Sequence, residues 1–425
     1  EMKGKELEVG IGEKPFYTPT NGQLPFTITI DSFIFGPLID PHIIPLAIHD
    51  LYLKKGSLDL IKKTLPAFIK YDTYLSENRD NNGDDLINII HQGESGWDNS
   101  KRWMLNSILK YVSCPVQRDK KFMQPPDFNT YFYLSRLAVA KFAELAGDDE
   151  MASGFRKRAA KTKTAIQTMW NEETGLYHDR YEEGRVPTDI KSFGGIIPML
   201  GGIPSKEQAE RLVANLTDPR LFWSEYPATS LNMDDPQFNA EDEYQSYWNG
   251  RVWPNMNWIL IEGLIRYGYH DIAADLMMKT LEMMVASGEP TCRENYRPFY
   301  ENGGHYRSQG HNTFNYGWGG IGADIMIHRI MGLQGVAPHD AIYLDPYFPK
   351  EWTFGSIDNV KIGDHEVKLD IRRSGNELQC ELVHSGANPL NLVHNQDEDT
   401  VHNGVMRFAI EDGKHLDFHW LSLLD

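Results

Sequence analysis

The sequence predicts a mainly α-helical body followed by a small C-terminal β-sandwich. Apolar residues recur at helical spacing from about residue 33 to residue 333. From about residue 341, apolar and polar residues alternate between glycine turns, which is the pattern of strands. We therefore divide the chain into a helical domain, 33–338, and a β-sandwich domain, 339–425. Because position 1 is Glu rather than Met, residues 1–32 are interpreted as an N-terminal extension or the remnant of a preceding segment.

The helical body is predicted to consist of paired helices. The periodic segments are 41–55, 57–78, 101–113, 128–146, 151–170, 191–200, 205–215, 254–268, 270–287 and 313–332. Short turns at 142–152 and 265–275 contain a Gly suited to a helix C-cap and an Asp suited to the next N-cap. Successive hairpins of this kind indicate either a closed ring of helices or a solenoid. The chain has no repeat of fixed period, which argues against the common solenoids.

Composition excludes several classes of function. The 425 residues carry a net charge of −18, so the phosphate-neutralising excess of a nucleic-acid binder is missing. No run of about 18 apolar residues exists that could span a membrane. The basic cluster at 156–163 has the spacing of the solvent face of an amphipathic helix. We expect neither a nucleic-acid partner nor a membrane-spanning segment.

Cysteine and histidine usage predicts no metal site and no cofactor. The three cysteines, Cys114, Cys292 and Cys380, are far apart and form no CxxC pair. The fifteen histidines include no HExxH pattern. Such sparse cysteines leave both a cytoplasmic and a secreted or periplasmic location open.

The stretch GESGWDNS, 93–100, is the first candidate catalytic loop. It places two carboxylates, Glu94 and Asp98, on either side of Trp97. Glycoside hydrolysis needs one protonated carboxyl and one ionised carboxylate, and apolar surroundings raise the pKa of the acid. Asp98 fits the acid, although Glu94 has an equal claim on composition. The alternative is that Asp98 or Ser100 only caps the helix that follows.

Two further loops are rich in aromatic and polar side chains. The segment 292–320 contains two possible bases, Glu294 and Glu301. It also holds the histidines and aromatic residues Tyr296, Tyr300, His305, Tyr306, His311, Tyr316 and Trp318. In the segment 244–258, the side chains of Trp248, Arg251 and Trp253 could frame a sugar subsite, with a core position for Trp253 as the alternative.

A calcium loop is considered at NRDNNGDDLI, 78–87, where Asp80, Asn82 and Asp84 alternate. The glycine and the final glutamate of a calcium-binding EF-hand loop are not at the required positions. A helix-ending turn is therefore the preferred interpretation.

The three loops together resemble glycoside hydrolase family 63, which is related to the trehalases of family 37. The similarity rests on HQGESGWDNSKRW, YWNGRVWPNMNWILIEGLIRYG and CRENYRP…GW, supported by SFIFGPLI, DNNGDDLI and PPDFNTYFYLSRLA. These motifs keep the family's order over roughly residues 30–335. The chain departs from the family at Gly250-Arg251-Val252-Trp253, where Arg251 replaces the proline of the family's RGPVW, and it lacks the trehalase signature QWDxPxGW.

The resemblance implies an (α/α)6 toroid, a six-hairpin glycosidase, that cleaves a terminal α-glucoside or α-mannoside of a small glycoside or oligosaccharide with inversion. It implies Asp98 as general acid, Glu294 as general base and Glu94 as a supporting residue. The sugar pocket would include Trp97, Arg102, Trp248, Arg251, Trp253, Tyr296 and Trp318.

Two alternatives remain open at this point, because one fold carries several chemistries. The chain could be a toroid enzyme of other specificity, such as a rhamnoside or uronic-acid hydrolase or a polysaccharide lyase that uses tyrosine and histidine. It could also be a carbohydrate-binding protein without catalysis.

Overall fold

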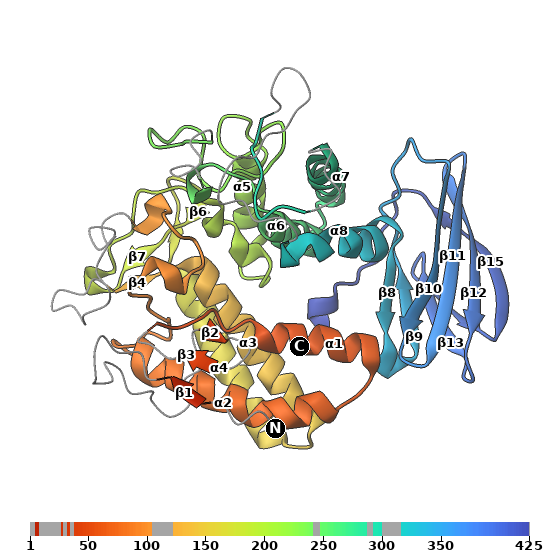
Figure 1. Ribbon diagram of the computed structural model, residues 1–425, viewed down its shortest axis with the longest axis horizontal. Coiled ribbons are helices and arrows are strands. Elements are labelled where there is room, and N and C mark those ends of the chain that lie inside the picture. Colours follow the sequence, from red (N-terminus) through yellow and green to blue (C-terminus); the bar gives the residue numbers. More distant parts are fainter. Residues whose placement is uncertain are drawn as a thin grey trace.

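The computed structural model describes residues 38–103, 122–240, 247–286, 292–299 and 316–424. It also describes three short strands, β1 (Lys5–Leu7), β2 (Thr27–Ile28) and β3 (Ser32–Ile34), in the order β1-β3-β2. Figure 1 shows a helical body on the left and a β-sandwich on the right.

Helical hairpins build the body. The pairs are α1 (Ile44–Lys55) with α2 (Asp59–Arg79), α3 (Pro126–Leu145) with α4 (Asp149–Gln167), and α6 (Pro254–Arg266) with α7 (His270–Ala286). The helices α5 (Lys206–Leu216) and α8 (Gly320–Asp324) complete the described set, and a π-helical turn, Ile325–Ile330, continues α8. The predicted turn between α3 and α4 is confirmed, since Gly147 has a φ of +84° and Asp148 accepts a hydrogen bond from the Met151 N–H.

The α3–α4 hairpin shows how the body is layered. Almost every residue of α3 is buried, whereas α4 buries only one stripe that includes Phe155, Ala159 and Ile166. An entirely buried helix beside an amphipathic one is the arrangement of an inner and an outer layer. The predicted basic face at 156–163 lies on the outer side of α4, where its cationic side chains are half-buried or exposed.

Two predicted helices differ from the observed elements. The segment 191–200 forms two 3-10 turns, Phe193–Gly195 and Ile197–Met199. A Cβ on Gly195 would lie 2.2 Å from the Tyr177 carbonyl oxygen. The backbone of residues 193–199 therefore packs directly against that of Tyr177, which requires glycine at position 195. Of the predicted helix 101–113, the structure describes only the 3-10 turn Lys101–Trp103, and the rest lies outside the described residues.

Two four-stranded sheets form the C-terminal sandwich. One has the order β10-β11-β12-β15 and the other β14-β13-β9-β8. Their bounds are β8 (Leu333–Val336), β9 (Ala341–Leu344), β10 (Phe354–Ile362), β11 (His365–Ser374), β12 (Glu377–Ser385), β13 (Leu390–His394), β14 (Asp397–Val401) and β15 (Gly404–Glu411). Leu369, Leu382 and Leu392 are fully buried between the sheets. The first strand begins at Leu333, ahead of residue 339 where the sequence places the start of the domain.

The remaining short elements lie in the loops of the helical body. They are the strands β4 (Met123–Gln124), β5 (Trp170–Asn171), β6 (Leu176–Tyr177) and β7 (Arg180–Tyr181). β4 pairs with β7 and β5 pairs with β6, both antiparallel. Among the described helices, none is long and apolar enough to cross a lipid bilayer.

The predicted fold class, a mainly α (α/α)6 toroid with a small C-terminal β-sandwich, is confirmed. After the sandwich, the chain returns to the helical body and ends its described part in a 3-10 helix, Trp420–Leu424 (Figure 1). Leu421 and Leu424 are buried in the helical core. The C-terminal segment therefore belongs to the core of the helical body although it follows the sandwich in sequence.

A buried carboxylate on α6 holds this returning segment. Glu262 pairs with Arg329 at 2.5 Å and accepts a hydrogen bond of 2.8 Å from the Trp420 indole N–H. His419 lies 3.2 Å from the same carboxylate. Burial opposes ionisation of Glu262, but Arg329 and His419 outweigh it and lower the pKa of this carboxyl to about 2.

We predict that Glu262→Gln lowers the free energy of unfolding by about 3–5 kcal/mol at neutral pH, because Arg329 is left buried without its charged partner. Chemical denaturation measures this change, and Glu210→Gln, an exposed position on α5, is the matched control. Equal stability of the two variants would contradict the assignment.

The same ion pair predicts a pH dependence. Because the folded pKa of Glu262 is below the ordinary value of 4.5, its stabilising contribution is complete above that pH and is lost as the pH falls toward 2. The difference in unfolding free energy between the native protein and Glu262→Gln should therefore shrink across this interval. A difference that stays constant down to pH 2 would show that Glu262 is not ionised in the folded protein.

Candidate active site

The loop that follows α2 is fixed by Glu94. This side chain is fully buried, and its carboxylate receives the Arg79 guanidinium at 2.6 Å. The backbone N–H groups of Ile90 and Ile39 donate to it at 2.7 and 3.1 Å. All these contacts face the protein interior, so Glu94 ties the loop to α2 and supports the residues that follow it.

Trp97 begins a column of three stacked indoles. It stacks on Trp248 with ring centroids 4.6 Å apart, and Trp248 stacks on Trp253 at 3.6 Å. All three rings are buried. The column joins the 93–103 loop to the 247–254 segment. It forms a rigid aromatic layer beside Asp98 and Tyr247, which are the sequence neighbours of Trp97 and Trp248.

Arg102 lies under the same column. Its guanidinium is 4.2 Å from the centroid of Trp97 and bridges two buried carboxylates, Asp127 at 2.7 Å and Asp179 at 2.6 Å. Burial alone would lower the pKa of Arg102, but the two carboxylates raise it above its ordinary value. Gly194 permits this position, because a Cβ there would lie 2.7 Å from Arg102 Nη1.

The structure does not bring Arg102 to a surface that a sugar could reach, since none of its side chain is exposed. Its guanidinium donates hydrogen bonds to both oxygens of Asp127 and to both oxygens of Asp179. Arg251 is buried as well, with Nη1 3.1 Å from Asn295 Oδ1. Both cations are buried, and Arg102 lies against the Trp97 ring of the column.

Asp98 differs from Glu94 because it keeps an exposed surface. Partial burial nevertheless raises the pKa of its carboxyl, and the positive form of His91 nearby opposes this rise. A carboxyl that is both solvent-facing and reluctant to ionise has the properties of a proton donor.

Glu294 is placed by a short β-bridge. The N–H groups and carbonyls of Val252 and Tyr296 exchange hydrogen bonds of 2.9 and 2.8 Å, which fixes the segment beside the start of α6. The Trp318 indole donates to the Glu294 carbonyl at 2.8 Å. The Tyr296 ring is fully buried, whereas Glu294 keeps a small exposed fraction of 7%.

Two tyrosines connect Glu294 with Asp98. The Tyr247 hydroxyl donates to Glu294 Oε1 at 2.6 Å, and the Tyr316 hydroxyl also hydrogen-bonds Glu294. The pKa values of both phenols are raised, first by burial, then by Glu294 and also by Asp98. The loop of Asp98 is fixed to the segment that carries Tyr247, because Trp97 stacks on Trp248 and the Trp248 N–H donates to Asn99 Oδ1 at 3.3 Å. The loop of Asp98 and the side chain of Glu294, which are distant in sequence, thus meet at the 247–248 segment.

The predicted residues therefore separate into two layers. Asp98, Glu294 and the half-buried Trp318 lie at the solvent side, whereas Trp97, Trp248, Trp253 and Tyr296 lie behind them. The sequence did not single out Tyr247, although it directly precedes Trp248, and Tyr316 had no particular role there. Part of the second loop, namely Tyr300, Glu301, His305, Tyr306 and His311, lies outside the described residues.

The Asp80–Asp84 segment forms the helix-ending turn. The carboxylate of Asp80 accepts the Asp84 and Asp85 N–H groups at 2.9 and 3.0 Å, and Asp84 pairs with Arg180 at 3.1 Å. The carboxylate oxygens of Asp80 and Asp84 are therefore used for hydrogen bonds within the turn and for the ion pair with Arg180 on β7. Within the described ranges, no cluster of three or more His, Cys, Asp or Glu side chains could hold a metal ion.

A helical toroid with carboxylates beside an aromatic layer is an arrangement that suits a carbohydrate-active enzyme. A family model for the mannosylglycerate hydrolase MGH1-like glycoside hydrolase domain matches residues 36–318. The chain belongs to this glycoside hydrolase family, and the resemblance to family 63 is confirmed. This membership favours a hydrolase over the lyase and the non-catalytic binding protein.

Comparisons with individual proteins are consistent with this family assignment. A mannosylglycerate hydrolase of Rubrobacter radiotolerans is 27% identical in an alignment of 309 residues, and the match covers 62% of this chain and 67% of that protein. Mannosylglycerate hydrolase MGH1 of Selaginella moellendorffii is 24% identical in an alignment of 277 residues, and the match covers 55% of this chain and 56% of that protein. A solved GH63 mannosylglycerate hydrolase from Thermus thermophilus shares the fold, with a TM-score of 0.57 and 20% identity over 65% of this chain and 75% of its own.

The buried position of Arg102 generates a prediction. Arg102→Met should lower the free energy of unfolding by about 3–5 kcal/mol, because Asp127 and Asp179 are left buried without their cation. Denaturant titration measures this loss. Arg220→Met removes an exposed arginine that pairs with Asp218, and it should cost less than about 1 kcal/mol. A stable Arg102→Met protein with a raised KM would instead identify Arg102 as a substrate ligand.

Proposed function

We propose that this protein hydrolyses the terminal α-mannosidic bond of a small glycoside such as mannosylglycerate, with inversion at the anomeric carbon. The observation that carries the proposal is that the Asp98 loop and Glu294 meet at one segment, where Trp248 stacks on Trp97 and the Tyr247 hydroxyl donates to Glu294. Two carboxyl groups with different surroundings are what such a reaction requires.

Asp98 is proposed as the general acid. Its raised pKa keeps a proton on the carboxyl at higher pH than an ordinary aspartate would, and its exposed surface allows contact with a leaving group. In the transition state it transfers this proton to the glycosidic oxygen as the bond to C1 breaks.

Glu294 is proposed as the general base. The Tyr247 and Tyr316 hydroxyls donate hydrogen bonds to its carboxylate, and such donors stabilise the ionised form. Glu294 takes a proton from a water molecule whose oxygen forms the new bond to C1. Asp98 ends the step ionised and Glu294 ends it protonated, and exchange with solvent restores both groups.

The mannoside is preferred over the glucoside because relatives of this family carry the name mannosylglycerate hydrolase. The half-buried Trp318 supplies a partly exposed indole beside Glu294, where the apolar face of a pyranose can pack. Trp97, Trp248, Trp253 and Tyr296 are proposed to hold this site in shape from behind, together with Arg102, Arg251 and Glu94.

We predict that Asp98→Asn and Glu294→Gln each lower kcat on mannosylglycerate roughly 10²–10⁴-fold, since each removes one proton-transfer group. The control is Asp218→Asn, at a partly exposed aspartate that pairs with Arg220, and it should keep full activity. A proton NMR time course with mannosylglycerate and glucosylglycerate measures the rates and the first anomer released. β-Mannose as the first product supports inversion, whereas α-mannose would overturn the roles given to both carboxylates.

Tyr247 provides a separate test through pH. Tyr247→Phe removes a donor to the Glu294 carboxylate, so the carboxylate becomes easier to protonate and the acidic limb of the kcat/KM profile should move to higher pH. The maximal rate should fall roughly tenfold. The control is Tyr269→Phe, in the turn before α7. An unchanged acidic limb in Tyr247→Phe would disconnect this tyrosine from the base.

A further inference from the structure

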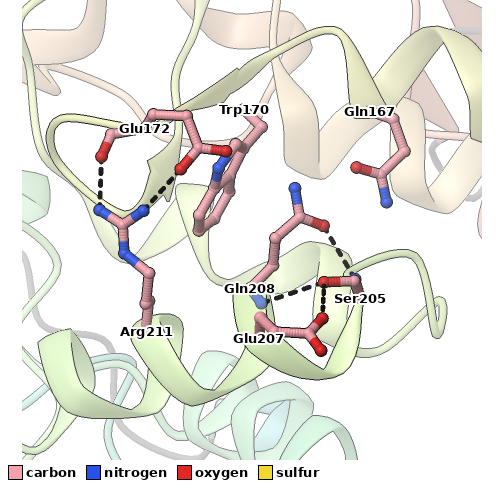
Figure 2. Close-up of a pocket in the computed structure, with 7 residues that line it drawn as sticks. All are labelled: Gln167, Trp170, Glu172, Ser205, Glu207, Gln208 and Arg211. Carbon is pink, nitrogen blue, oxygen red and sulfur yellow. Dashed lines mark hydrogen bonds and ion pairs between the residues drawn. The ribbon is translucent and has the colours of Figure 1, made fainter.

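A second pocket lies on the helical body, at the junction of α4, the β5–β6 hairpin and α5. It has a volume of about 480 Å³, within the range of small-molecule sites. Figure 2 shows the residues that line it: Gln167, Trp170, Glu172, Ser205, Glu207, Gln208 and Arg211. None of them belongs to the site that contains Asp98 and Glu294.

The indole of Trp170 forms one wall of this pocket. Trp170 pairs with Tyr177 in the β5–β6 hairpin, and their rings meet edge to face at 5.1 Å. The indole N–H is buried, and none of the residues that the structure describes accepts its hydrogen bond. Because protein atoms cover this nitrogen, the pocket is offered the ring of Trp170 and not its N–H group.

Arg211 and Glu172 close the pocket beside this indole. Arg211 Nη1 lies 2.7 Å from Glu172 Oε2 and Nη2 lies 2.5 Å from the Glu172 carbonyl oxygen. The guanidinium carbon is 5.4 Å from the centroid of the Trp170 ring. The positive charge of Arg211 is therefore matched by a carboxylate of the protein itself, so it gives the pocket no net attraction for anions.

The first turn of α5 presents polar groups at the opposite side. Ser205 and Gln208 form a capping box, in which Gln208 Oε1 accepts the Ser205 N–H at 2.8 Å. The Tyr177 hydroxyl donates to the same oxygen at 3.3 Å. Because the carbonyl side of this amide serves the protein, its NH₂ group faces the pocket as a donor, as Figure 2 shows.

Glu207 supplies an acceptor in the same turn of α5. It is exposed, and hydrogen bonds from its own backbone N–H and the Ser205 hydroxyl lower the pKa of its carboxyl. An ionised carboxylate accepts hydrogen bonds and donates none, which suits neighbouring hydroxyl groups of a sugar. With Arg211 matched by Glu172, the Glu207 charge makes the pocket slightly negative.

We propose that this pocket is a second carbohydrate-binding site, which takes a neutral hexose unit. The apolar face of the sugar ring would lie against the indole of Trp170, and its hydroxyl groups would meet the Gln208 amide and the Glu207 carboxylate. An anionic ligand is disfavoured by the charge balance. The inference rests on these residues alone and stands whether or not Asp98 and Glu294 have the roles proposed above.

Fluorine NMR of the full chain labelled with 5-fluorotryptophan tests this site. The ten tryptophans give separate reporters, and Trp170→Phe assigns the resonance of Trp170. Titration with D-mannose and D-glucose should shift that resonance saturably. Glu207→Gln, which keeps the helix cap, should weaken the binding of the hexose roughly tenfold because an acceptor charge is lost.

The matched control is Glu210→Gln on the exposed side of the same helix, which should change the affinity by less than about twofold. A Trp170 resonance that no hexose moves would overturn the proposal, as would equal weakening by Glu207→Gln and Glu210→Gln. A response to D-glycerate without a response to hexose would replace it with an anion site. Hydrolysis of mannosylglycerate is measured separately, so failure here leaves the proposed function untouched.

Discussion

The candidate site depends on one buried electrostatic contact, the guanidinium of Arg102 between Asp127 and Asp179. It joins three segments that are distant in sequence: the loop of Asp98, the first turn of α3 and the residues after β6. A single carboxylate would leave the cation poorly matched, and either carboxylate without the cation would be costly to bury. The position of Trp97, and with it the column of indoles, follows from this contact.

The indole column connects this buried ion pair with the residues of the candidate site. Its three rings are held by stacking, which is stiff because aromatic side chains have few rotatable bonds. Tyr247 packs edge to face on Trp253 at 4.8 Å, and its hydroxyl holds Glu294. The chain therefore positions a carboxylate through an uninterrupted series of packed rings, and flexible side chains contribute little to its placement.

Much of this was accessible from the sequence, because helix periodicity, the caps around Gly147 and Asp148, and strand alternation are local signals. The roles of Asp98 and Glu294 were predicted from sequence motifs that resemble those of glycoside hydrolase family 63. Which of these residues are buried could not be predicted from the sequence. Arg102 and Arg251 have side chains suited to binding a substrate, but both are buried. Contacts such as Arg102 with Asp179, or Tyr247 with Glu294, join distant segments, and residue spacing carries no information about them.

The return of the C-terminal segment has a consequence for synthesis on the ribosome. Trp420, Leu421 and Leu424 pack into the helical body, and Trp420 reaches Glu262 on α6. The helices emerge before the sandwich, and the sandwich emerges before this segment. Part of the apolar interior of the helical body and the Glu262–Arg329 pair therefore stay uncovered until the C-terminal segment has been synthesised. During that interval it is a natural client for chaperones that bind exposed apolar surface.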